Sequence, residues 1–336
     1  MNRNFTLLAL LLLIFSCSQK QPLGTKEHIF GRKGKHIVWI QVAGLEQEHL
    51  SLLKFDKETT SAKLAFERMN CVGSKWSFNL FDLRPNSNHG FLSQMLGSQN
   101  IKGECRDFDR KSVWDYFAEQ GYSVGVYEGP QVKDNSLIGF KDCPGEFKPL
   151  RNTYVWSQKM GSTGDLKYHY QEGTGLSAPG VYYDKSCQKD GCFVPLKTNV
   201  EKIWKGFTDK NSKTFFTLRT FNLEKALKNK KLIDAKEALS DLDSLVNFFM
   251  KEAQTKSLLL VVSTSGSIGL ELPNTGFKWS EYLKKGRHVN YRKVRTQSPV
   301  WSFGEGAENF CGIFEEQEIL TRFLWMPERN LLNFSL

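Results

Sequence analysis

The sequence predicts an α/β fold with a central, mostly parallel sheet, and three segments carry this prediction. Residues 36–44 and 258–266 are apolar, β-branched runs that each end in a small residue followed by glycine. Buried parallel strands have this composition, because helices cover both faces of such a sheet. Residues 232–253 have the apolar spacing of an amphipathic helix and lead directly into the second run.

Further elements fit the same class. Residues 108–120 have helical spacing and Gly121 stands where a helix ends, before an alternating, strand-like segment at 122–127. Such a helix–glycine–strand unit is typical of α/β folds. We also expect a helix at 45–55, a strand at 214–219 and a final strand at 300–303.

Length and charge limit the function classes. The 336 residues include 40% apolar residues, enough for one large folded domain. The formal net charge of +10 favours anionic surroundings, such as nucleic acid, lipid head groups or acidic polysaccharide.

The N-terminus indicates export. Arg3 precedes a short apolar stretch that ends in Ile14-Phe15-Ser16-Cys17, which resembles the bacterial lipobox. The resemblance implies cleavage before Cys17 and lipidation of its thiol, while the alternative is an ordinary secretory signal with an incidental cysteine. Ser18 follows instead of the aspartate that retains lipoproteins at the inner membrane, so we expect an outer-membrane anchor. Nucleic acid is then excluded as a partner.

This assignment divides the chain into three parts. Residues 1–16 form a lipoprotein signal peptide, residues 17–35 form a polar tether, and residues 36–336 form the domain. Within the domain, residues 129–204 are rich in glycine, polar residues and lysine, and we expect an irregular insertion or cap there.

Six cysteines remain after Cys17, and an even number in an exported chain favours disulfides. Cys187 and Cys192 bracket the turn sequence Gln-Lys-Asp-Gly, which makes a local bridge between them the best single prediction. Zinc binding is the alternative, but the chain has no CxxC pair with histidines nearby.

Several segments together resemble the alkaline phosphatase and sulfatase superfamily. The strand end Ala43-Gly44 is similar to that family's Asp-Gly, and residues 262–266, Val-Ser-Thr-Ser-Gly, are similar to its Ser-Asp-His-Gly. Residues 86–97 resemble the segment in which a nucleophile opens a helix, and Ser298-Pro299-Val300 resembles the closing strand. The resemblance implies a three-layer α/β/α sandwich and hydrolysis of phosphate or sulfate esters with one or two divalent metals.

The departures from the family pattern concern the metal. Ala43, Thr264 and Ser265 stand where the resemblance implies carboxylate and imidazole ligands, and residues 217–223 contain no histidine or carboxylate. Neutral hydroxyls add no charge to hold a dication. We therefore expect no metal cofactor. The alternative is zinc, calcium or manganese bound by residues of the 129–204 insertion: Asp165, Glu172 and Asp184.

Ser87 falls at the family's nucleophile position. A serine at a helix N-terminus lies where the helix dipole and free N–H groups favour an anion. The alternative is a simple helix cap, which serine often provides. His89 is a candidate general base beside it or else a surface histidine.

Residues 278–295 form the best binding candidate, because cations alternate there with Trp279, Tyr282 and Tyr291. Such a pattern suits anionic glycans or lipid head groups, and its alternative is a solvated face. The resemblance also relates His288 to the family's last metal-binding histidine. The predicted anion-binding residues are Lys284, Lys285, Arg287, His288 and Arg292.

Three functional hypotheses follow. The first is a non-catalytic envelope lipoprotein that binds an anionic component. The second is a metal-dependent phosphate- or sulfate-ester hydrolase or transferase with Ser87 as the nucleophile. The third is a structural envelope protein with an unrelated α/β fold.

Overall fold

The computed structural model describes residues 34–55, 63–83, 86–129, 136–144, 149–159, 167–168, 178–188, 191–293 and 296–324. The signal peptide, Cys17 and nearly all of the tether lie outside these residues. Among the described residues, no helix has both the length and the apolar character needed to cross a membrane.

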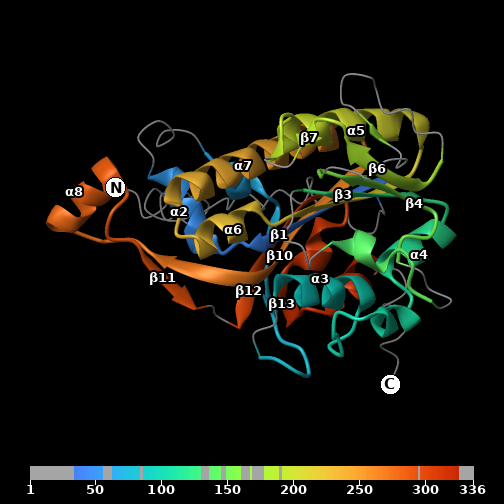
Figure 1. Ribbon diagram of the computed structural model, residues 1–336, viewed down its shortest axis with the longest axis horizontal. Helices are drawn as coiled ribbons and strands as arrows, with labels where there is room; N and C mark the ends of the chain where they lie inside the picture. The colour runs from blue at the N-terminus through green and yellow to red at the C-terminus, as the bar shows by residue number, and fades with distance from the viewer. Residues whose placement is uncertain are drawn as a thin grey trace, which may run out of the picture.

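One large sheet runs through the molecule in the order β13-β2-β12-β10-β1-β9-β3-β4-β6-β5, and β11 pairs with the far end of β10 (Figure 1). A separate hairpin consists of β7 (Cys187–Gln188) and β8 (Gly191–Cys192). The strands of the large sheet are β1 (His36–Gly44), β2 (Cys71–Trp76), β3 (Ser123–Glu128), β4 (Thr153–Ser157), β5 (Lys167–Tyr168), β6 (Gly180–Asp184), β9 (Thr214–Thr220), β10 (Leu258–Glu271), β11 (Asn290–Lys293), β12 (Gln297–Gly304) and β13 (Gly312–Glu315).

The centre of the sheet is parallel, as the sequence predicts. Strands β10, β1, β9, β3, β4 and β6 all run in one direction, and β12 is antiparallel to both of its neighbours, β10 and β2. From Ile37 onward every residue of β1 is buried, which explains why its sequence is almost continuously apolar.

Helices cover both faces and produce three layers (Figure 1). On one face, α2, α5, α6 and α7 contribute to a core with β1, β9 and β10, while on the other α3, α4 and α9 contribute to a second core. The helices are α2 (Leu50–Lys54), α3 (Ser87–Leu96), α4 (Val113–Glu119), α5 (Leu196–Lys210), α6 (Asn222–Lys228), α7 (Leu232–Thr255), α8 (Gly276–Lys285) and α9 (Glu318–Leu324). Short 3-10 turns are η1 (Gln47–His49), η2 (Phe66–Arg68), η3 (Cys105–Asp109), η4 (Leu137–Phe140) and η6 (Ala307–Phe310).

Several predicted helices and strands begin or end at other residues in the structure than the sequence predicts. The expected helix at 45–55 is a 3-10 turn followed by the short α2. The helix expected at 108–120 begins only at Val113, because Ser112 and Asp115 form a reciprocal capping box that fixes its start. The strand at 300–303 is part of β12 and is not the last, since β13 follows it.

The 129–204 segment departs from the irregular insertion that we expected. Its described parts contribute β4, β6 and the short β5 to one end of the main sheet. In β4, Tyr154-Val155-Trp156 has strong strand propensity, and Trp156 is fully buried against Phe216 and Phe207. The core therefore extends into this segment.

Three disulfides join the six cysteines of the domain: Cys71–Cys311, Cys105–Cys143 and Cys187–Cys192. The predicted local bridge between Cys187 and Cys192 is confirmed, and it links the two strands of the β7–β8 hairpin.

Candidate functional site

The carboxyl ends of the parallel strands meet at one edge of the sheet, where ligand sites of open α/β sheets lie. Ala43 on β1 pairs with Ser265 on β10, so two of the three predicted former metal positions are neighbours there. The Ala43 methyl group packs with the rings of Phe91 and Phe221 in a small buried cluster. An apolar cluster thus occupies this part of the edge.

Ser87 lies at the same edge, as the first residue of α3. Its side chain is only 1% exposed, and its Oγ donates a hydrogen bond of 2.7 Å to Oε1 of Glu224. The helix cap is the preceding residue, Asn86, whose Oδ1 accepts the N–H of His89 at 2.9 Å. The capping role considered for Ser87 therefore belongs to its neighbour.

Two glycines allow the helices to approach the strand ends closely. Gly266 has φ +54°, and a Cβ added there would lie 2.8 Å from the backbone nitrogen of Ser87. Gly44 has φ +79°, and its added Cβ would lie 3.1 Å from Cα of Glu224. Both glycines adopt a backbone conformation that other residues rarely take. The N-terminal ends of α3 and α6 are thus packed directly onto β10 and β1.

Arg219, at the end of β9, places a buried positive charge at this edge. Its Nη1 donates to Glu128 Oε1 at 2.7 Å, and its Nη2 donates to Asn88 Oδ1 on α3 at 2.8 Å. The guanidinium is 5.7 Å from the centre of the Phe91 ring and 5.5 Å from that of Phe221. Burial lowers the pKa of Arg219, and the attraction and hydrogen bond of Glu128 oppose this shift.

A second buried pair lies on the other side of α3. Lys75 Nζ on β2 donates to Glu316 Oε1 at 2.6 Å and to the hydroxyls of Ser77 and Ser298 at 2.9 Å each. Both charged side chains are fully buried. Burial lowers the pKa of Lys75, and the nearby Glu316 carboxylate opposes this. The three acceptors satisfy the three N–H groups of the ammonium.

Gln94 on α3 connects this pair to Ser263 and Thr264 in the middle of β10. Its amide nitrogen donates to Glu316 Oε1 at 2.7 Å and to the Thr264 carbonyl at 2.9 Å, and its oxygen accepts Ser263 Oγ at 2.6 Å. The Ser265 hydroxyl fills the space beside Gly90, where an added Cβ would lie 1.7 Å from it. The side chains of Gln94 from α3 and Ser265 from β10 thus fill the space between this helix and this strand.

These residues do not fit a divalent metal. The carboxylate beside Ser87 is Glu224, and Lys228 Nζ already pairs with it at 3.0 Å. Arg219 adds a second positive charge at this edge, which would repel a dication. In the described part of the chain, only Asp184, Cys187 and Cys192 place three potential ligand atoms within 4.8 Å of one another, and the two cysteines form a disulfide.

Two other predicted site residues, His89 and Asp184, have side-chain contacts away from Ser87. The His89 ring lies against Gly103, and no hydrogen bond joins it to Ser87 among the contacts of the described residues. Asp184 accepts hydrogen bonds from the Ser186 N–H and from the Asn199 amide. Asp165 and Glu172 lie outside the described residues.

Three of the five predicted anion-binding residues lie around one acid, Glu281. Lys285 Nζ lies 3.7 Å, Arg287 Nη1 3.8 Å and His288 Nε2 2.9 Å from the carboxylate of Glu281. Lys284 is exposed on the same helix, α8. Arg292, on β11, lies 3.6 Å from Glu48 instead. Four of the five residues therefore form one surface.

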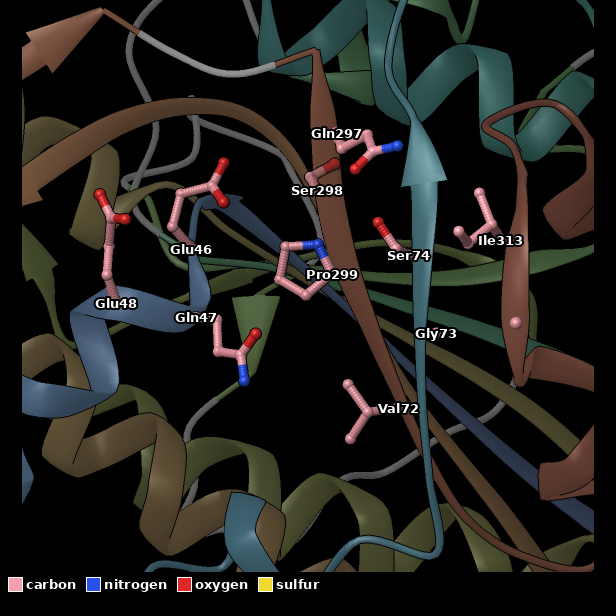
Figure 2. Close-up of a pocket in the computed structure, with 11 residues that line it drawn as sticks. Glu46, Gln47, Glu48, Val72, Gly73, Ser74, Gln297, Ser298, Pro299 and Ile313 are labelled. Carbon is pink, nitrogen blue, oxygen red and sulfur yellow. The ribbon is translucent and has the colours of Figure 1, made fainter.

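A cavity of about 620 Å³ lies beside β2, β12 and β13, and Figure 2 shows the residues that line it. The carboxylates of Glu46 and Glu48 line one side of it, opposite the strand residues. A cavity lined by two acids does not suit the anionic ligand that the basic residues predict. Its lining residues are Glu46, Gln47, Glu48, Val72, Gly73, Ser74, Gln297, Ser298, Pro299, Gly312 and Ile313.

Comparison with solved structures identifies the fold. The alkaline phosphatase from the Antarctic bacterium TAB5 superimposes with a TM-score of 0.63 at 14% identity, over 87% of this chain and 98% of that one. The alkaline phosphatase of Thermus thermophilus gives a TM-score of 0.66 at 10% identity, over 96% and 94% of the two chains. The chain has the alkaline phosphatase fold.

A further structure with this fold type is the lipoteichoic acid synthase LtaP from Listeria monocytogenes, with a TM-score of 0.51 at 14% identity, over 87% of this chain and 71% of that one. No protein-family model matches the sequence, and no curated protein matches it either. The alkaline-phosphatase-like fold is thus retained at very low sequence identity.

The sequence reasoning missed the charged residues of this edge. Glu128 is the last residue of β3 and Arg219 the penultimate residue of β9, and a charged residue near the carboxyl end of an apolar strand is a signal that a sequence can show. Glu224 lies one residue beyond the 217–223 segment in which we found no carboxylate. Lys75 and Glu316 had no such signal, because their pairing depends on β2 and the end of β13 meeting in space.

Proposed function

We propose that this protein is a non-catalytic, lipid-anchored envelope protein that keeps the alkaline phosphatase fold as a binding scaffold. The observation that carries the proposal is the packed carboxyl edge, where the Ala43 methyl and two aromatic rings lie beside the buried Arg219–Glu128 pair. The lipobox ending at Cys17 supports the anchor, and the cations of α8 support an anionic envelope ligand.

Charge explains why the edge favours a scaffold over a metalloenzyme. A metal site needs anionic or imidazole ligands left available to the ion. Here Arg219 compensates Glu128, Lys228 compensates Glu224 and Lys75 compensates Glu316. The chain thus provides its own cations for these three carboxylates, which leaves less negative charge there to attract an ion.

The second candidate function is hydrolysis or transfer of phosphate or sulfate esters by Ser87. The observation in its favour is the 2.7 Å hydrogen bond to Glu224, because a carboxylate within this distance can accept the proton of a nucleophilic hydroxyl. Against it, Ser87 is buried and its partner carboxylate is held by Lys228.

A substrate panel separates the two functions. Purified full-length protein is assayed with aryl phosphates, phosphodiesters and aryl sulfates, in chelator and with added zinc, magnesium, manganese or calcium. We expect the same background rate for the protein and for Ser87→Ala. Turnover that disappears in Ser87→Ala would establish the enzyme and refute the scaffold proposal.

A further inference from the structure

A projecting arm extends from the sheet beyond Gly266. The end of β10 pairs with β11 in an antiparallel ladder from Ile268–Lys293 to Glu271–Asn290, and α8 lies at its outer end (Figure 1). At the base, His49 Nε2 donates to the Ile268 carbonyl at 2.7 Å, and Glu48 accepts the Leu270 N–H at 2.9 Å. The arm is thus fixed to the body rather than joined by a single loop.

Positive charge is concentrated on this arm. Residues 276–293 contain six lysines and arginines and one glutamate, a net charge of +5. This is half of the chain's formal net charge of +10, in eighteen residues. Such a segment attracts an anionic surface strongly at moderate ionic strength.

The two faces of α8 have different roles. Trp279 and Tyr282 stack on each other, and Trp279 also packs edge-on against Phe55 of the body. Helical spacing places Phe277, Lys284 and Lys285 on the opposite face. The Phe277 side chain is 74% exposed there, and both lysines are exposed as well.

Glu281 holds part of the cationic group together. Its carboxylate lies between Lys285, Arg287 and His288, so one negative charge gathers these side chains at the C-terminal end of α8. The remaining lysines of the helix, Lys278 and Lys284, are exposed. An aromatic ring beside clustered cations is the composition of helices that lie in a membrane interface.

The length of the tether limits how far the anchor can lie from the arm. Gly34, the first described residue, lies beside Leu259 at the start of β10, and the arm leaves from the other end of that strand. Sixteen residues, 18–33, separate Cys17 from the first described residue, and an extended chain of this length spans at most about 55 Å. A protein lipidated at Cys17 therefore always has a bilayer close to its surface.

We propose that α8 is a docking helix for the anionic surface of the bilayer that carries the Cys17 anchor. Lys284, Lys285 and Arg287 contact the phosphates of the head groups, and Phe277 enters the interface between head groups and acyl chains. This inference rests on the proposed function, because the anchor at Cys17 keeps a bilayer within the length of the tether. It goes further by identifying the ligand as a lipid surface rather than a soluble anion.

The test uses full-length lipidated protein reconstituted in vesicles of phosphatidylcholine alone or mixed with phosphatidylglycerol. Flotation of the vesicles measures anchoring, and hydrogen exchange of residues 276–293 measures docking. We expect slower exchange in this segment on the anionic vesicles only. The triple variant Lys284→Gln/Lys285→Gln/Arg287→Gln should reduce the ratio of docked to undocked arms about a hundredfold.

Two further variants make the result specific. Lys202→Gln/Lys205→Gln/Lys210→Gln removes the same charge from exposed positions on α5 and should leave docking unchanged. Phe277→Ser should weaken docking while all the cations remain.

Each outcome has one meaning. Protein that floats but shows equal exchange on both vesicle types overturns the docking helix and leaves the anchor intact. Equal protection by inorganic phosphate or a sulfated polysaccharide on neutral vesicles also overturns it, in favour of a soluble anion. Protein that does not float refutes the lipid anchor, and the inference fails with it.

Discussion

Buried charged side chains define the carboxyl edge at the scale of single residues. Arg219 and Lys75 are each compensated by one carboxylate and each linked to α3 through an amide side chain, Asn88 or Gln94. A buried charge is stabilised by a partner of opposite charge and by hydrogen bonds. Each charge here has an oppositely charged partner, although Arg219 Nε and Glu316 Oε2 are buried without a hydrogen bond among the described residues. These residues therefore couple the helix that carries Ser87 to strands on both sides of it.

The Lys75–Glu316 pair yields a stability prediction. Lys75→Met leaves Glu316 buried without its cation and should lower the free energy of unfolding by about 3–5 kcal/mol. The double variant Lys75→Met/Glu316→Met should recover most of this loss, because neither charge remains. Urea unfolding of the three proteins measures the difference.

The matched control is Lys54→Met, which removes a lysine paired at 3.0 Å with Glu67 at an exposed position. We expect a change below about 1 kcal/mol, since exposed ion pairs contribute little. A double variant as unstable as Lys75→Met alone would contradict this account of the buried pair.

His49 predicts a dependence of stability on pH. It is buried, its Nδ1 accepts the Glu46 N–H at 3.0 Å, and burial lowers its pKa to about 4. Between pH 6.5 and 4 the unfolded chain binds a proton that the folded chain does not. Stability should therefore fall as the pH falls through this range, by about 3 kcal/mol in total.

His49→Asn should flatten this part of the pH profile, because no group at this position then titrates. Chemical unfolding at pH 7.5 and pH 4.5 compares the two proteins. The same loss of stability in both would show that His49 is not the group responsible.

At the scale of elements, the sequence predicts the parallel strands at the centre of the sheet well and the outermost strand, β13, poorly. Strands β1, β9 and the start of β10 are long apolar runs, so composition alone locates them. Strand β13 has four residues, two of them exposed, and among the described strands it pairs with β2 alone. The Cys71–Cys311 disulfide beside this pairing joins residues that are 240 positions apart in the sequence. No local pattern predicts a strand that depends on such a distant partner.

The Cys71–Cys311 disulfide fixes that distant pairing. In the chain-entropy description, Cys71→Ala/Cys311→Ala should lower the free energy of unfolding by about 5 kcal/mol, because it opens a loop of 240 residues. Cys187→Ala/Cys192→Ala, with a separation of 5 residues, should cost about 2 kcal/mol. Urea unfolding without reductant measures both, and equal losses would contradict the prediction.

At the scale of the whole molecule, the sequence predicts the fold class and points to Ala43, Thr264 and Ser265, but it does not predict the contacts around them. Ala43 is the penultimate residue of β1, but Thr264 and Ser265 lie inside β10, which continues to Glu271 beyond the strand end that the sequence predicts. Glu128 and Glu224 reach the carboxyl edge from elements far apart in the sequence. Only the folded arrangement shows that lysines and arginines already compensate the carboxylates there.

Metal stoichiometry tests the central claim, that the alkaline phosphatase fold of this chain no longer holds the catalytic metals. Full-length protein is incubated with zinc, manganese or calcium, separated from free ions by gel filtration and analysed by elemental mass spectrometry. The packed edge, with its internally compensated carboxylates, predicts well under one ion per chain for every metal. One or two ions per chain that remain bound through the separation would contradict it.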